Sequence, residues 1–207
     1  MEEFTQLSSW QIDAIKEIGN IGAGNAATAL SQMVQAKINI GVPRVSILPF
    51  AQVPNIFGSP DTQVVGIYFN VTGSAPSSIL LIIKADKAEL LINMLLMRSS
   101  GQTDINNLNE LEKSALMELG NIISAKYLNA MSMFTQLDFV ASVPALGIDM
   151  AGAILNAILA QFGEIADHVL LLETDFTQND NEVVVHFFLL PEPDSLAIIL
   201  EALGVTD

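Results

Sequence analysis

Ala14-Ile-Lys-Glu-Ile-Gly-Asn-Ile21 is the stretch that decides the fold, because it recurs as Ala115-Leu-Met-Glu-Leu-Gly-Asn-Ile122 at an offset of 101 residues. Five of the eight positions are identical, and two of the other three differ only as Ile against Leu. The same offset carries Val42-Pro43 onto Val143-Pro144. Composition alone seldom produces such a match, so the sequence predicts two copies of one structural unit.

The repeat sets the expected domain organisation, which is a single domain made of two halves. The first half covers residues 1–98, the polar residues 99–109 form the connection, and the second half covers residues 110–207. Hydrophobic periodicity predicts the elements of each half. In the first half they are a helix over about residues 9–36, strands over 37–50, 63–72 and 77–84, and a helix over 85–98. In the second half they are a helix from about 108, strands from about 137, over 168–174 and over 182–190, an added helix over 149–162, and a closing helix from 194.

The expected fold class is α/β (α+β). A three-stranded sheet in one half alone would leave an apolar face uncovered, so the two halves must share a sheet. We therefore expect two αβββα-type halves, related by a pseudo-twofold axis, that share one mostly antiparallel six-stranded sheet. The long helices that carry the candidate site would lie on its surface.

The charge of the chain narrows the classes of partner. Eight Lys and Arg residues against 23 Asp and Glu residues give a net charge of −15. Nucleic acids and anionic lipid surfaces are bound mainly through clustered cations, so neither is expected as a partner. The absence of cysteine excludes disulfides and thiolate chemistry. An acidic N-terminus and polar residues throughout the longest uncharged stretch predict a cytoplasmic protein with no membrane insertion.

Helix geometry then isolates a candidate site. At about 100° per residue, Asp13, Glu17 and Asn20 fall on one strip of the first helix about 60° wide, with Gly24 beside it. The second copy repeats the strip as Ser114, Glu118 and Asn121, with Ala125 in place of Gly24. The opposite side, which should face the core, carries Ile15, Ile18, Gly22, Ala29 and Met33. A solvated face has no physical reason to repeat Glu and Asn in register, so the strips are candidate functional surfaces.

The repeated pattern Asp/Ser-x3-Glu-x2-Asn-x22-Pro resembles the signature of the CheC/CheX/FliY family of chemotaxis phosphatases. It is matched by Asp13, Glu17, Asn20 and Pro43, and again by Ser114, Glu118, Asn121 and Pro144. The resemblance extends over essentially the whole chain and is closest to the CheC subgroup. FliY chains continue into a flagellar switch domain, for which no room is expected after Asp207. A switch-complex component like FliY is therefore the less favoured reading.

The resemblance implies an enzyme that dephosphorylates the phosphorylated response regulator CheY. Glu17 and Glu118 would pair with a lysine of the receiver domain, and Asn20 and Asn121 would hold the attacking water. Asp13 and Ser114 would form surface hydrogen bonds at the interface, and Pro43 and Pro144 would fix the start of the first strand of each half. No cofactor of its own is expected, because the receiver would supply Mg²⁺. A carboxylate acting as general base remains the competing mechanism.

The resemblance also implies a second partner, the receptor deamidase CheD. Within the family this partner binds the region of the added helix, which here carries Asp149, Ala151, Ile154 and Ile158. Core packing explains these apolar residues equally well, so both readings stay open. The alternative function is a non-enzymatic adaptor that binds phosphorylated CheY and regulates CheD.

Overall fold

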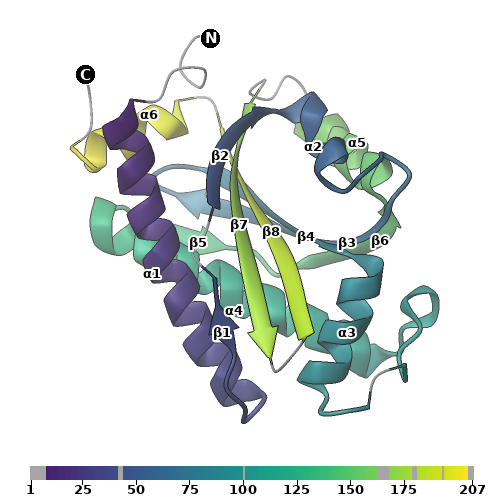
Figure 1. Cartoon of the computed structure of the whole chain (residues 1–207). Coiled ribbons are helices and arrows are strands. Elements are labelled where there is room, and N and C mark those ends of the chain that lie inside the picture. The colour runs from purple at the N-terminus through teal and green to yellow at the C-terminus, as the bar shows by residue number, and fades with distance from the viewer. Residues whose placement is uncertain are drawn as a thin grey trace.

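The computed structural model describes residues 8–41, 44–99, 101–162, 168–178, 181–192 and 194–204. Helices and strands follow in the order drawn in Figure 1. The first half contains α1 (Ser9–Met33), β1 (Asn39–Ile40), β2 (Arg44–Pro49), α2 (Val53–Ile56), β3 (Gln63–Gly73), β4 (Ser77–Lys84) and α3 (Ala85–Leu95). The second half contains α4 (Glu110–Thr135), β5 (Phe139–Ala141), β6 (Ala145–Met150), α5 (Ala151–Phe162), β7 (His168–Gln178), β8 (Asn181–Pro191) and α6 (Ser195–Ala202). Short 3₁₀ turns lie at Phe50–Gln52 and Ile105–Asn107.

All strands of the described residues belong to one antiparallel sheet, which confirms the predicted fold class. The order is β1-β7-β8-β4-β3-β5, with β2 also on β7 and β6 also on β3. The sheet therefore has the six predicted positions but eight segments, because each outer strand is divided in two. Between Val71↔Ala141 and Tyr68↔Ala145, two residues of β3 face three of the outer strand, which is a bulge.

The two halves exchange their outer strands. Both β1 and β2 of the first half pair with β7, whereas β5 and β6 of the second half pair with β3. The hairpins β3–β4 and β7–β8 meet at the centre, where Ile82 is opposite His186 and Ser77 is opposite Pro191. Each half thus closes the sheet of the other, as the expected pseudo-twofold axis requires.

Helices cover the two faces of the sheet unequally. Alternate residues of β8 point to opposite faces: Val185 and Phe187 join the large core cluster with α1, α3, α4 and α6. Phe188 and Leu190 join a smaller cluster with α2 and α5. Figure 1 shows α2 and α5 together at the upper right, apart from α1 at the left. Among the described residues, no helix is long and apolar enough to span a membrane.

Close packing explains two of the glycines inside the long helices, Gly22 and Gly120. A Cβ on Gly22 would lie 2.8 Å from Cδ1 of Tyr127, so α1 and α4 cross here in near backbone contact. A Cβ on Gly120 would lie 2.8 Å from Cγ2 of Ile67 and 3.2 Å from Cζ of Phe69, which seats α4 on β3. A glycine is about 1 kcal/mol less favourable than an alanine inside a helix. The two close contacts explain why glycine is nevertheless present at these positions.

Several local predictions differ from the structure. Residues 37–50 do not form one strand but β1, β2 and the start of a 3₁₀ turn. Asp149 and Met150 end strand β6, so the added helix begins at Ala151, and its shorter counterpart α2 was not predicted. On α1, Ile15, Ile18 and Gly22 are buried as expected, but Ala29 and Met33 are only half-buried. The buried side is completed by Ala23, Ala26, Ala27 and Leu30.

Tyr127 connects the crossing of α1 and α4 to the sheet. Its buried hydroxyl makes the free energy of unfolding fall at alkaline pH. Its ring stacks on Phe187 at 4.4 Å, its hydroxyl lies 2.9 Å from that of Thr174, and burial raises its pKa to about 12. In the unfolded chain the Tyr127 hydroxyl has its ordinary pKa of 10.0. Because the folded value is raised, this stabilisation is complete below pH 10 and is lost as the pH rises through 12. The total loss is roughly 3 kcal/mol.

Tyr127→Phe is expected to flatten this dependence. The variant should be about 1 kcal/mol less stable at pH 8, where the Thr174 contact is lost, and at least as stable as the parent at pH 11.5. Urea unfolding at the two pH values measures both differences. Tyr68, whose pKa burial also raises, is present in both chains and cancels. Equal loss of stability in the two chains would contradict the assignment.

Candidate functional site

Both candidate strips lie on helices whose first turns are capped. At the start of α1, the Ser8 hydroxyl accepts from the Gln11 amide at 3.3 Å, and the Gln11 side chain accepts from the Ser8 amide at 2.8 Å. At the start of α4, the Asn109 side chain accepts from the amides of Leu111 and Glu112, and the Glu112 carboxylate accepts from the Asn109 amide at 2.9 Å. These reciprocal capping boxes fix where each helix begins, and so fix the rotation of each strip.

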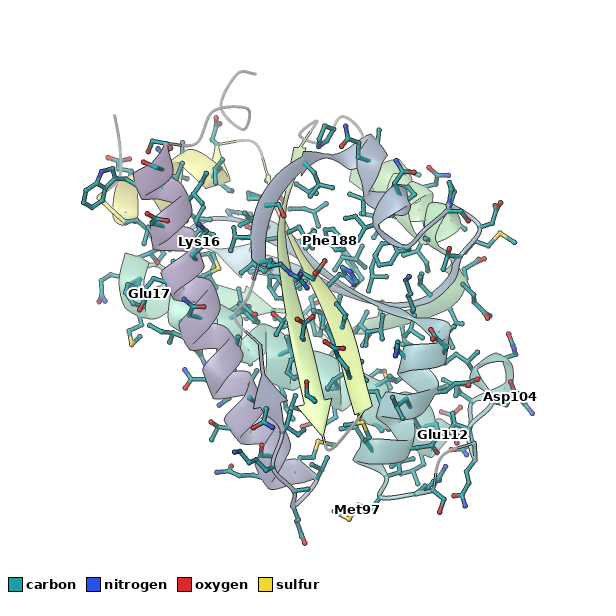
Figure 2. The ribbon with its side chains drawn as sticks, in the orientation of Figure 1. Lys16, Glu17, Met97, Asp104, Glu112 and Phe188 are labelled. Atoms are coloured by element: carbon teal, nitrogen blue, oxygen red, sulfur yellow. The ribbon has the colours of Figure 1, made fainter. Side chains whose placement is uncertain are left out.

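The structure brings the predicted residues of each strip together on an exposed helix face. Asp13, Glu17 and Asn20 are all exposed on α1. Figure 2 places Glu17 on the outer side of this helix, away from the sheet. On α4, Ser114, Glu118 and Asn121 are likewise all exposed. A carboxylate and a carboxamide three residues apart on one face can reach a common partner.

In each strip, the glutamate and the asparagine differ from other polar groups on the same helices because their side chains are unpaired. Among the described residues, no hydrogen bond or ion pair involves the side chain of Glu17, Asn20, Glu118 or Asn121. By contrast, Asp13 lies 3.5 Å from Lys16 and Glu110 lies 2.9 Å from Lys113. The two acid–amide pairs are therefore available to another molecule.

A bare patch of helix follows each pair, as the sequence predicted. Apart from the neighbouring backbone of α1 itself, no atom lies within 4 Å of the position that a Cβ on Gly24 would occupy. Its counterpart Ala125 is exposed and adds only a methyl group. Neither residue would prevent a partner from approaching the helix backbone beside Asn20 or Asn121.

The two strips face away from each other. The contact of Gly22 with Tyr127 lies beyond Asn20 in α1 and beyond Asn121 in α4. At about 100° per residue, Gly22 projects about 180° from Asp13, on the side of α1 opposite the strip. Each strip therefore occupies its own surface, and one partner molecule on one strip does not cover the other.

The second proline lies directly before β6 and not before β5, which is the first strand of its half. Pro144 follows β5 and precedes β6, at the bulge in the outer strand, where a missing N–H is tolerated. This corrects the expected position. The bulge lies opposite Phe69 of β3, whose ring packs against Gly120, the residue before Asn121. The first proline, Pro43, lies outside the described residues.

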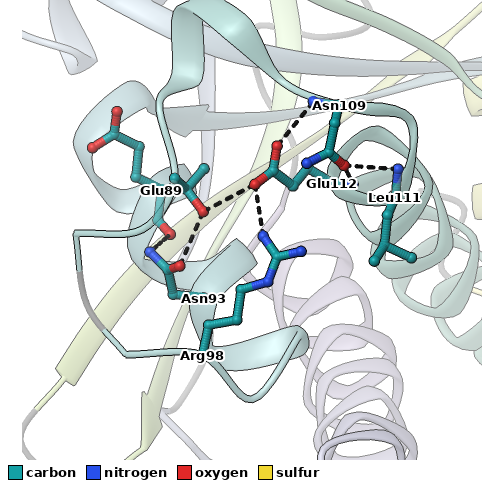
Figure 3. Close-up of polar contacts among 7 residues, drawn as sticks. Glu89, Asn93, Arg98, Asn109, Leu111 and Glu112 are labelled. Carbon is teal, nitrogen blue, oxygen red and sulfur yellow. Dashed lines mark hydrogen bonds and ion pairs between the residues drawn. The ribbon is translucent and has the colours of Figure 1, made fainter.

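A buried polar network anchors the start of α4 (Figure 3). The Glu112 carboxylate, 5% exposed, accepts from Nη1 of Arg98 at 2.8 Å and from the Thr103 hydroxyl at 3.5 Å. The Thr103 hydroxyl also donates to Oδ1 of Asn93 on α3 at 3.0 Å. The connection between the halves is thus tied to both helices that flank it.

The four residues proposed to bind CheD fall into two groups. Ala151 is fully buried and Ile158 is 5% exposed, both in the smaller core cluster, so these two side chains present no surface to a partner. Ile154 is half-buried, with its methyl groups against Gly66 and Gly147. Only Asp149 is exposed, at the end of β6. Of the two readings left open, core packing describes Ala151, Ile154 and Ile158.

The sequence interpretation missed two exposed apolar residues next to the strips. Trp10 is 78% exposed and Leu111 is 58% exposed. They precede Asp13 and Ser114 by three residues and stand at equivalent positions of the repeat, 101 residues apart. That offset was the signal that could have found them.

Comparisons with known proteins agree with the repeat and the fold. The profile of the CheC-like family matches residues 11–47 and 111–148, which contain the two strips. The chain is 34% identical over 210 residues to the CheY-P phosphatase CheC of Bacillus subtilis (strain 168), with 100% of both chains covered.

Two solved structures show the same fold at low sequence identity. Thermotoga maritima FliY is 21% identical with a TM-score of 0.75, covering 96% of this chain and 98% of that chain. CheX in the CheX-CheY-BeF3-Mg+2 complex from Borrelia burgdorferi is 17% identical with a TM-score of 0.51, covering 83% of this chain and 96% of that chain.

Proposed function

Because this chain belongs to the CheC-like family, we propose that it hydrolyses the aspartyl phosphate of the response regulator CheY at two sites, Glu17 with Asn20 and Glu118 with Asn121. The full-length match to a CheY-P phosphatase supports the reaction. The CheX-CheY complex supports a receiver domain as the partner. The observation that carries the proposal is the exposed, unpaired acid–amide pair that occurs once in each half.

The two side chains of each pair take different roles. The carboxylate forms an ion pair with a lysine of the receiver and so orients the helix on the phosphorylation pocket. The carboxamide, one helical turn further on, enters the pocket and holds a water in line with the phosphorus. An amide suits this position because it is neutral and both donates and accepts hydrogen bonds. Catalysis of phosphoryl transfer depends mainly on positioning the attacking water and the phosphoryl group, and the protein need not form a covalent bond.

The charges of the chain fit a substrate that brings its own cations. Both arginines are engaged elsewhere: Arg44 lies 2.7 Å from Glu173, and Arg98 lies 2.8 Å from Glu112. Neither belongs to a strip. In the proposed reaction the receiver's Mg²⁺ and lysine neutralise the phosphoryl oxygens, and this chain contributes the water-positioning amide.

Neutralising the two acids is expected to weaken docking without removing catalysis. Glu17→Gln together with Glu118→Gln keeps the size and shape of both side chains. The KM for a phosphorylated receiver should rise about tenfold, and its dependence on salt should diminish, because the ion pair with the receiver lysine is lost. The kcat should stay within about twofold. Phosphate release from the receiver in the presence of Mg²⁺ measures all three quantities.

Glu182→Gln is the matched control, because Glu182 is an exposed glutamate of β8 and belongs to neither strip helix. It should leave both constants unchanged. If the double variant instead loses kcat at an unchanged KM, the carboxylate acts as a general base and the docking role is wrong. If the parent chain releases no phosphate from the receiver, the proposed function itself fails.

The adaptor role toward CheD stays a prediction. Because Ala151 and Ile158 are buried, such a surface would have to use exposed residues of the same region, such as Asp149, Ala153 and Ala157. No contact among the described residues favours CheD over another partner, so the phosphatase is the function that the geometry supports best.

A further inference from the structure

Two large apolar side chains are exposed at equivalent points of the repeat, and each lies at the start of a strip. Trp10 is in the first turn of α1 and is 78% exposed, and Leu111 is in the first turn of α4 and is 58% exposed. A single exposed apolar residue is ordinary on a protein surface. A pair that repeats with the acid–amide strips is not explained by chance exposure.

Helix geometry puts each apolar side chain on the same face as its strip. Trp10 precedes Glu17 by seven residues, about two turns, so the two project within about 20° of each other. Along the axis, Trp10 lies about 10 Å from Glu17 and about 15 Å from Asn20. Leu111 has the same relation to Glu118 and Asn121. A compact domain of about 100 residues has a radius of gyration of about 13 Å, so one such domain spans the whole strip.

Neither side chain serves the fold in a way that requires its size. The two core clusters contain neither Trp10 nor Leu111. The capping boxes use the side chains of Ser8 and Gln11 in α1, and of Asn109 and Glu112 in α4. A polar residue would therefore serve equally well for folding at positions 10 and 111. A tryptophan side chain that contacts a partner, however, typically buries about 150–250 Å² of surface.

We propose that Trp10 and Leu111 are apolar docking contacts for the phosphorylated receiver domain, one at each site. This inference rests on the proposed function and extends it. The receiver is the occupant that fits because the apolar contact is continuous with the acidic residues, so one partner with a lysine near its phosphorylation pocket and an apolar border engages both. Since tryptophan offers more contact area than leucine, the α1 site binds the receiver more tightly than the α4 site.

The kinetic test uses chains in which one site works alone. In the Asn121→Ala background, which retains the α1 site, Trp10→Ala should raise the receiver KM about tenfold with kcat unchanged. In the Asn20→Ala background, which retains the α4 site, Leu111→Ala should raise KM about threefold, and Leu111→Trp should lower it. Met97→Ala is the matched control, because Met97 is 62% exposed but lies beyond α3, at the lower end of Figure 2. It should change nothing.

A second measurement follows docking without hydrolysis. Trp10 is the only tryptophan of the chain, so its fluorescence reports on the α1 site alone. A receiver whose own tryptophans are replaced, loaded with Mg²⁺ and BeF3, should shift the Trp10 emission to the blue and protect it from iodide quenching. The same receiver without BeF3 should do so more weakly.

The outcomes separate this inference from the proposed function. If phosphate release occurs and depends on the asparagines, but Trp10→Ala leaves KM unchanged and the emission does not shift, the docking contact is wrong and the function stands. If the chain releases no phosphate, the function fails first. Light scattering tests the other occupant: a dimer of this chain that Trp10→Ala dissociates, with an unchanged receiver KM, would also overturn the proposal.

Discussion

Replacing both Asn20 and Asn121 with alanine is expected to reduce phosphate release to the receiver's own spontaneous rate, a loss of about 100-fold or more. Removing a single well-placed hydrogen-bonding group from an active site typically lowers kcat by a factor of about 10²–10³. Here each amide is the group proposed to hold the attacking water. Both asparagines are exposed on long helices, and alanine is a better helix former, so the fold should be retained.

The single variants sharpen this prediction. Because the two strips face away from each other, each should work independently, and the rates of Asn20→Ala and Asn121→Ala should add up to the rate of the parent chain. Asn25→Ala is the matched control, since Asn25 is exposed on α1 but outside the strip. A double variant that still works at the parental rate would rule out the amide mechanism. Rates of the single variants that fall well short of the parental sum would show that the sites cooperate.

Gly73→Ala is expected to cause the largest loss of stability, about 3–5 kcal/mol. Gly73 ends β3, pairs with Phe139 of β5 and has a φ of 128°, which side chains other than that of glycine rarely adopt. A Cβ there would clash with the carbonyl oxygen of Asp138 and lie 2.9 Å from its carbon. Because the obstacle is backbone that is held in the sheet, it cannot turn aside as a side chain can. Chemical denaturation of the two chains measures the difference.

Gly101→Ala separates the two causes. Gly101 has a φ of 79°, but nothing lies within 4 Å of the position of its Cβ. Gly101→Ala should therefore lower the free energy of unfolding only by the strain of the backbone conformation, about 1 kcal/mol. If the two variants lose equal stability, the clash with Asp138 contributes nothing and the estimate for Gly73 is wrong.

The repeat made most of the fold predictable. The 101-residue offset defined two equivalent halves, and neither half could cover its own sheet, so the two had to share one. The period of the pattern also placed the long helices within a few residues of their observed ends. The exchange of outer strands was not predictable in this way. Residues 37–50 read as an apolar strand whichever hairpin they join, and their pairing with β7 depends on where the second half lies in space. The division of the outer strands depends on a one-residue shift in register that no local pattern records.

The strips were predictable because helical periodicity alone determines which residues share a face. Glu17, Asn20, Glu118 and Asn121 are exposed together as the spacing requires. The apolar α5 region was not resolved by the same means, since its residues are apolar or small on nearly every side. Only the packing of α5 against α2 and the sheet decides that Ala151 and Ile158 are core. Trp10 was overlooked because an isolated tryptophan in a first turn has no periodic partner within its own half.

The exchange of outer strands also has a consequence for how the chain is made. When the first half leaves the ribosome, β1 and β2 have no partner, and β4 lacks its neighbour β8. At about 5–20 residues per second, the second half follows only after roughly 5–20 s. Throughout that time the run Ile79-Leu80-Leu81-Ile82-Ile83, entirely buried in the finished protein, has an open edge. Until β8 is made, this unpaired apolar edge can pair with another copy of the chain.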